Sequence, residues 1–317
     1  MGKRADIDLD EIADWSNLVE AAYRAALGKR SHPDVAEFLN SLDSRLASLR
    51  AEILGGTVSV GATTEFHIRD PKPRVIHAPC FRERVLHHAV MARVGPVLDR
   101  ALIDDTFACR VGKGTVAAVR RCQQHARRFP WYAKLDIRGY FASIEHAVLQ
   151  AQLARRFKSS RLLHLLGRII DSHHTAPGKG LPIGALTSQY FANAYLGPCD
   201  RFLLESCRVS GVVRYMDDFL FWDLSRERVT QTVEQVRAFA ADELRLTVKD
   251  EFQLPPRVGR DRVGYSRVED RSWCRSSHPW RELEQRRTER ARGLPQREPS
   301  GQPERRPRLP LLELTRT

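Results

Sequence analysis

The chain has 317 residues, 42% of them apolar, which is enough to bury one large core or two smaller ones. Its formal net charge of +13 predicts a polyanionic partner, with nucleic acid as the first candidate. A membrane partner is not expected, because no apolar run approaches the roughly 20 residues of a spanning helix and the N-terminus lacks the apolar stretch of a signal peptide. The six cysteines show no zinc-ligand spacing, which favours reduced thiols in a cytoplasmic protein.

Residues 8–54 are predicted to be helical, because apolar side chains recur three and four positions apart. The second of the expected helices spans residues 33–54 and ends at Gly55, and a strand-like segment follows through residues 66–68. We therefore assign residues 1–66 to an N-terminal helical region whose role is packing.

Basic residues then alternate with prolines before a short apolar strand. Lys72 and Arg74 would project from that strand, where such residues are either solvated or able to bind a triphosphate. A helix over residues 81–94 follows, and its adjacent His87 and His88 are expected on the helix surface or in the core rather than on a metal.

A glycine turn at residues 112–115 reads GKGT but lacks the spacing of a Walker A phosphate loop. It precedes a predicted helix over residues 116–127, so its backbone N–H groups and Lys113 could still meet a phosphate.

The stretch YAKLDIRGYFASI, residues 132–144, places Asp136 at the end of a short apolar strand. Phe141 follows five residues later and, taken by itself, reads as a core residue. One or two amphipathic helices are expected over residues 147–171. The next stretch, residues 178–203, begins GKGLPIGALTSQYF, in which Gly184 permits close backbone approach to a substrate before another helix.

Residues 212–221 read VVRYMDDFLF, which predicts two short strands meeting at a tight acidic turn. An Asp-Asp pair alone is commonly an exposed turn, but adjacent carboxylates repel unless a cation lies between them. Together with Asp136, the acids Asp217 and Asp218 could hold a metal pair about 4 Å apart, an arrangement that promotes phosphoryl transfer.

In this order, the three stretches resemble motifs A, B and C of reverse transcriptases, and the resemblance covers roughly residues 15–268. It implies an α+β right-hand polymerase, with an antiparallel palm sheet and a fingers and palm domain at residues 67–268. Two Mg²⁺ ions, or Mn²⁺, would be held by Asp136, Asp217, Asp218 and the backbone carbonyl of Ile137.

The resemblance also implies roles around the nucleotide. Arg74, and after it Lys72, would contact the triphosphate, and Phe141 would pack under the sugar and exclude a 2′-hydroxyl. Lys249, in the sequence LTVKDEF, would protonate the leaving pyrophosphate, although a surface lysine is the simpler reading of that position. Residues 263–265 look like the primer-grip hairpin.

The motif B stretch has Ile183 where most of the superfamily has glutamine, and Gly184 and Gln189 complete the part expected to cradle the nascent base pair. Losing one amide hydrogen bond weakens discrimination by about 1 kcal/mol, so the polymerase should be less strict. The pattern LPIGxxTSQ, with the HHA and ACRxGKGT segments, resembles the enzymes of diversity-generating retroelements, and this resemblance implies an element that mutates adenines during copying.

Residues 269–317 depart from the family, because they are rich in Arg, Pro, Gln and Glu where a thumb should show helical apolar stripes. We expect a disordered basic tail and a degenerate or missing thumb. A tail that binds RNA by charge is one explanation, and a shifted reading frame is the favoured one.

The expected function is error-prone, RNA-templated DNA synthesis. Its partners would be an RNA template, a DNA primer, deoxynucleoside triphosphates and, as a further candidate, a small helical accessory protein. Within the same class, the alternatives are a retron, group II intron-like or phage-defence reverse transcriptase. From a different class, the alternative is a catalytically idle nucleic-acid-binding protein.

Overall fold

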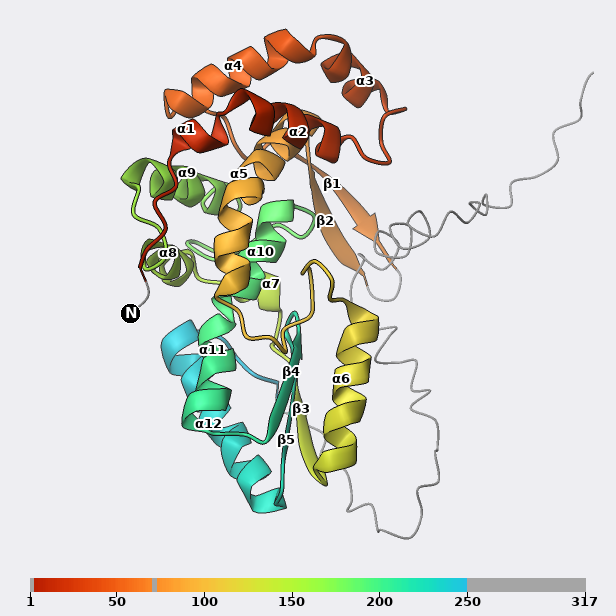
Figure 1. The fold of residues 1–317 in the computed structure, drawn as a ribbon, viewed down its shortest axis with the longest axis vertical. Helices are drawn as coiled ribbons and strands as arrows, with labels where there is room; N and C mark the ends of the chain where they lie inside the picture. The colour runs from red at the N-terminus through yellow and green to blue at the C-terminus, as the bar shows by residue number, and fades with distance from the viewer. Residues whose placement is uncertain (1–2, 70–72, 250–317) are drawn as a thin grey trace, which may run out of the picture. The chain divides into compact units, whose positions relative to one another are not determined.

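Four short helices begin the computed structural model, which describes residues 3–69 and 73–249 (Figure 1). They are α1 (Leu9–Ile12), α2 (Trp15–Ala25), α3 (Pro33–Asn40) and α4 (Leu42–Leu54). The two longer helices expected from the sequence are therefore each broken once. The carboxylate of Asp14 accepts the Asn17 N–H and starts α2, and the Ser41 hydroxyl donates to the Glu37 carbonyl where α3 ends.

A two-stranded hairpin and the longest helix follow. Strand β1 (Thr63–Ile68) pairs antiparallel with β2 (Arg74–Pro79), which confirms both short strands expected from the sequence. Helix α5 (Phe81–Arg100) runs six residues, about 1.7 turns, beyond the expected end at residue 94 and packs against α2 and α10. Residues 70–72, and with them the predicted nucleotide contact Lys72, lie outside the described residues.

A three-stranded antiparallel sheet carries the predicted acids. It consists of β3 (Trp131–Leu135), β4 (Gly211–Tyr215) and β5 (Asp218–Asp223), in the order β3-β5-β4. Helices α6 (Thr115–Arg128) and α12 (Arg226–Leu244) lie on opposite sides of the sheet (Figure 1). The expected α+β class with an antiparallel palm sheet is confirmed.

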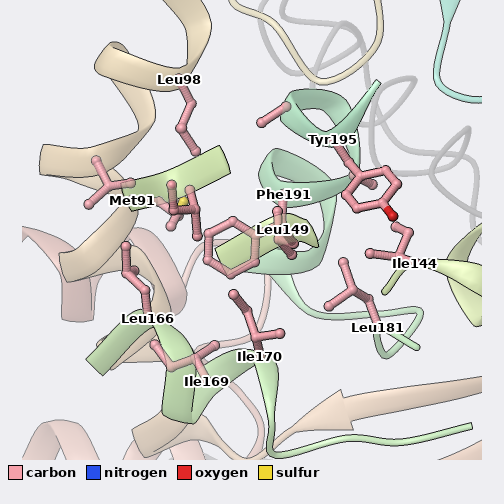
Figure 2. Close-up of a cluster of buried hydrophobic side chains, with 14 of the residues drawn as sticks. Met91, Leu98, Ile144, Leu149, Leu166, Ile169, Ile170, Leu181, Phe191 and Tyr195 are labelled. Carbon is pink, nitrogen blue, oxygen red and sulfur yellow. The ribbon is translucent and has the colours of Figure 1, made fainter. Parts of the chain in front are cut away.

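The remaining helices join the N-terminal region to the sheet. They are α7 (Tyr140–Ser143), α8 (His146–Ala154), α9 (Ser160–Ile170), α10 (Leu186–Tyr195) and α11 (Gly197–Arg201), which continues into the π-helical turn Phe202–Ser206. Figure 2 shows buried side chains of α5, α8, α9 and α10 meeting in one cluster, among them Met91, Leu149, Leu166, Ile170 and Phe191. This apolar cluster fixes α10, and therefore motif B, against the rest of the core.

The sequence predicted neither a membrane-spanning helix nor paired cysteines. Among the helices of the described residues, none is both long and apolar enough to cross a membrane. The five cysteines in this part of the chain are free thiols. The primer-grip hairpin at residues 263–265 and the tail at residues 269–317 lie outside the described residues.

Candidate active site

Strands β4 and β5 join in the tight acidic turn expected from the sequence. Tyr215 pairs with Asp218, so Met216 and Asp217 alone form the loop between them. Met216 has a φ of 56°, in the left-handed region that costs a non-glycine residue about 1–2 kcal/mol. This turn holds Asp217 and Asp218 at one end of the sheet.

The strand register brings Asp136 to the same end. Strands β3 and β5 pair from Trp131↔Asp223 to Leu135↔Phe219, and Asp136 is the next residue along β3. One further step of this register places Asp136 opposite Asp218, and side chains at opposed positions point to the same face of a sheet. The three acids therefore come from neighbouring strand ends, as motifs A and C predict.

Lysines neutralise two of these carboxylates. The Lys249 ammonium binds the Asp136 carboxylate, and Lys134 Nζ lies 3.6 Å from Asp218 Oδ1. The Lys249 N–H also donates to the Asp136 carbonyl at 2.9 Å. The Lys249 and Asp136 side chains are 42% and 36% exposed, and ion pairs of that exposure contribute at most about 1 kcal/mol. Another cation can therefore replace the ammonium at small cost.

The donor set fits a hard divalent cation by its chemistry, because carboxylate and carbonyl oxygens are the ligands that Mg²⁺ and Mn²⁺ prefer. Ile137 forms an antiparallel bridge with Val248, but its two hydrogen bonds use the Asp136 carbonyl and the Arg138 N–H. The Ile137 carbonyl is thus outside that bridge. Within the described residues, no group of three or more acidic, His or Cys side chains is arranged to hold a metal, and the Asp136 carboxylate binds Lys249 instead.

Arg214 on β4 supports the acidic turn through hydrogen bonds, and its side chain is fully buried. Its Nε and Nη2 bind the two carboxylate oxygens of Asp200 at 2.7 and 2.8 Å, while Nη1 donates to the carbonyl of Met216 at 2.9 Å. The remaining N–H groups donate to the side-chain and backbone oxygens of Asn193. All five guanidinium donors are therefore used, and one of them fixes the left-handed residue of the acidic turn.

Burial and nearby charges shift the pKa values of Arg214 and of its neighbour Tyr140. Burial would lower the pKa of Arg214, but the Asp200 carboxylate outweighs it and the pKa lies above its ordinary value. Burial also raises the pKa of Tyr140 well above its usual range, an effect that Arg214 opposes and the Asp217 carboxylate increases. Tyr140 therefore stays neutral beside the site, and its hydroxyl donates to the carbonyl of Ala192 in α10.

Backbone hydrogen bonds link α7, motif B and β2. Phe141 in α7 is 8% exposed, and its carbonyl accepts the Leu181 N–H at 2.8 Å. Two residues later, the Ile183 carbonyl accepts the N–H of His77 on β2 at 2.7 Å. Arg74 begins the same strand and is partly buried. Two backbone hydrogen bonds thus connect the three segments that carry the predicted nucleotide-contacting residues Phe141, Ile183 and Arg74.

Gly184 makes its close approach to β2. Its φ is 130°, and a Cβ at this position would lie 2.5 Å from the carbonyl oxygen of His77. Any larger residue would therefore push motif B away from β2. The sequence had instead suggested that the backbone of Gly184 approaches the substrate. Gln189 is buried in α10, and the Cys109 thiol donates to its Oε1 at 3.2 Å.

Sequence reasoning missed Lys134, Arg214, Asp200 and Asn193. A signal existed for one of them, because Arg214 is the one charged residue in the otherwise apolar stretch VVRYM of an expected strand. An arginine at such a position needs a partner, since unpaired buried charges are strongly unfavourable. The sequence does not indicate which acid supplies it.

Comparisons of the sequence with known proteins identify a family and several relatives. Residues 68–251 match the family described as "Reverse transcriptase (RNA-dependent DNA polymerase)". Protein YkfC of Escherichia coli K12 is 25% identical over 238 residues, covering 69% of this chain and 61% of YkfC. Group II intron-encoded protein LtrA of Lactococcus lactis is 21% identical over 140 residues, covering 42% of this chain and 23% of LtrA. The matched part is therefore less than two thirds of either relative.

Two telomerases are among the solved structures that match this chain. Apo telomerase from Candida tropicalis, truncated from the C-terminal domain, gives a TM-score of 0.48 at 13% identity, over 65% of this chain and 52% of that one. Telomerase from Candida albicans with a TWJ fragment of telomeric RNA gives 0.45 at 13% identity, over 70% and 47%. The family match covers more than half of this chain and contains Asp136, Asp217 and Asp218, so the chain belongs to the reverse transcriptase family.

Proposed function

We propose that the chain is an RNA-directed DNA polymerase that extends a DNA primer on an RNA template with deoxynucleoside triphosphates. The observation that carries the proposal is the strand register that brings Asp136 opposite Asp218, next to the turn that holds Asp217. In the proposed organisation, residues 1–66 form the helical N-terminal region and residues 67–268 the fingers and palm.

Reverse transcriptases generally use divalent metal ions. Asp136, Asp217, Asp218 and the Ile137 carbonyl are the groups that would hold two Mg²⁺ ions, or Mn²⁺. When bound, such ions supply the positive charge that activates the primer 3′-hydroxyl and stabilises the leaving pyrophosphate. Before Asp136 can hold an ion, its ion pair with Lys249 must open. Both side chains are partly exposed, so opening costs little free energy.

Other residues of the chain have separate tasks in this proposal. Once released from Asp136, the Lys249 ammonium donates a proton to the pyrophosphate oxygen that leaves. Arg74 and Lys72 bind the triphosphate through charge-assisted hydrogen bonds. The ring of Phe141, which is buried near the start of α7, would fill the space that a 2′-hydroxyl needs.

For the biological role, we favour error-prone copying in a diversity-generating retroelement, with a small helical accessory protein as partner. The support is the aliphatic Ile183 in place of an amide, which leaves the nascent base pair without one hydrogen bond. A group II intron-like role is the second candidate, and the match to LtrA supports it. The two roles share the same polymerisation chemistry.

Primer extension with the full chain tests both levels of the proposal. On an RNA template annealed to a DNA primer, we expect templated extension with Mg²⁺ or Mn²⁺ and product errors concentrated opposite template adenines. Binding of the template-primer without extension under either metal would identify an idle nucleic-acid-binding protein. Extension with errors spread evenly over the four template bases would rule out the diversity-generating role and leave the polymerase.

A further inference from the structure

A cavity of about 820 Å³ lies outside the active site, bounded by the N-terminal segment, the ends of α5 and α8, and α11. The cationic side chains that line it are Lys3, Arg4, Arg100, Arg155, Arg156 and Arg201. None of its lining residues is acidic, and none belongs to the set of predicted catalytic or nucleotide-binding residues. The N-terminal segment and α8 lie beside one another at the left of Figure 1.

Backbone pairing fixes the N-terminal side of this cavity. The Ala5 N–H donates to the Arg156 carbonyl at 2.7 Å, and the Lys158 N–H donates to the Ala5 carbonyl at 3.0 Å. Ala5 thereby forms a parallel bridge with Phe157, whose side chain is fully buried. The two basic residues before Ala5 are therefore held at the cavity by the fold.

The cationic groups of the cavity have no counter-charge within residues 3–69 and 73–249, where none of the six forms an ion pair. Arg201 Nη1 instead donates to the carbonyl of Ala101 at 3.1 Å. Burial lowers the pKa of Arg156, and the positive charge of Arg201 lowers it further. Like charges held together cost free energy, which a bound anion offsets.

We propose that this cavity binds the phosphodiester backbone of RNA outside the active site, an inference that rests on the proposed RNA substrate. Five of the six cations are arginines, whose planar forks match phosphate oxygens in pairs. A free polyphosphate has the same chemistry and is the other source of such an anion. RNA is favoured because it is the substrate of the proposed function, and because six cations around about 820 Å³, with no acidic lining residue, can meet several successive phosphates of one strand.

The test uses the full chain with Arg100→Gln and Arg155→Gln combined. Both residues are exposed and neither side chain forms a hydrogen bond or ion pair within the described part of the chain, so folding should be unaffected. The matched control combines Arg24→Gln with Arg45→Gln, which removes the same charge from exposed positions on α2 and α4. Fluorescence anisotropy then measures binding of a fluorescein-labelled, unprimed single-stranded RNA over a salt series.

We expect the cavity variant to show a salt slope shallower by about 1.4, from roughly 0.7 for each of two lost phosphate contacts. If the two proteins bind equally at 1 M salt, where screening removes the phosphate contacts, this slope difference corresponds to about 25-fold weaker RNA binding at 0.1 M salt. The control should stay close to the unmodified chain. Equal RNA binding by both double variants would overturn the proposal.

Competition identifies the source of the anion. Inorganic tripolyphosphate should displace the RNA only weakly at equal phosphate concentration; stronger displacement would make the cavity a site for free polyphosphate and overturn the RNA assignment. Poly-glutamate that binds more tightly than RNA of equal charge would indicate an acidic protein partner and also overturn it. Loss of RNA binding in the cavity variant supports the inference even where the unmodified chain extends no primer, so the two proposals fail separately.

Discussion

The guanidinium of Arg214 and the carboxylate of Asp200 form a fully buried, two-pronged ion pair, with N–O distances of 2.7 and 2.8 Å. The same guanidinium donates to the carbonyl of Met216, one residue before Asp217. The pair therefore joins α11 to β4 and holds the backbone of the acidic turn in a conformation that Met216 would not adopt readily by itself.

Replacing Arg214 with methionine should destabilise the fold by about 3–5 kcal/mol, because it leaves the Asp200 carboxylate buried and unpaired. Adding Asp200→Leu should recover most of the free energy of unfolding, since a buried ion pair can often be replaced by apolar residues. Urea denaturation measures both effects. The recovered double variant should still extend primers poorly, because the Met216 carbonyl has lost its donor. Extension at the rate of the unmodified chain would show that the pair is structural only.

Stability should fall in mild acid because of His88 on α5. Burial, aided by the positive charge of Arg84, lowers its pKa from 6.5 to about 4. The unfolded chain therefore binds more protons between these values, and the free energy of unfolding decreases as the pH drops from 6.5 toward 4. We expect a loss of about 2 kcal/mol between pH 7 and pH 5 from this group.

Urea denaturation of the unmodified chain and of His88→Gln at these two pH values checks this expectation. The variant should lose about 2 kcal/mol less, because glutamine does not titrate. The same loss in both proteins would assign the pH dependence to other groups.

The sequence predicted most of the fold because its periodic patterns are local. The strands at residues 66–68 and after Arg74, the acidic hairpin and the longer helices all follow from spacing and turn residues. The breaks at Asp14 and Ser41 were not predicted, because single side-chain to backbone hydrogen bonds interrupt otherwise continuous apolar stripes. Hydrogen bonds of this kind do not change the spacing of the apolar residues, so the hydrophobic pattern does not reveal them.

The candidate site was less predictable. Asp136, Asp217 and Asp218 could be found from motifs, and the strand register then brings Asp136 and Asp218 opposite one another. The partners of Arg214 could not, because Asp200 and Asn193 come from other elements and meet it only after α10 and α11 pack against β4. The close approach of Gly184 was predicted as a feature of the residue, but its neighbour on β2 depends on tertiary structure.

Phe141→Ala should allow ribonucleotide incorporation, because loss of the ring opens the space beside the 2′ position. The side chain is 8% exposed, and removing a buried phenylalanine costs about 3–5 kcal/mol, so denaturation must first show that the variant folds. Single-nucleotide extension with matched deoxy and ribo substrates gives the ratio of kcat/KM values. An unchanged ratio in a folded variant would mean that Phe141 serves the core alone.

Ile183→Gln should reduce errors opposite template adenine, because the amide adds a hydrogen bond that favours correct pairing by about 1 kcal/mol, or roughly fivefold. The Ile183 carbonyl bonds to His77 through the backbone, so the substitution leaves that contact unchanged. Sequencing of products from one fixed RNA template measures the error rate at each base. Equal rates for both proteins would separate Ile183 from fidelity.

If the acidic turn performs nucleotidyl transfer, then Asp217→Asn should abolish primer extension. The change keeps the size of the side chain and removes one carboxylate from the turn, while the cationic cavity and the rest of the fold remain. Primer extension on an RNA template and anisotropy with the same template-primer should be measured side by side. We expect extension to be lost while binding stays within about twofold, since charge and not this carboxylate dominates affinity. Extension by Asp217→Asn at the rate of the unmodified chain would show that the acidic turn is not the catalytic site.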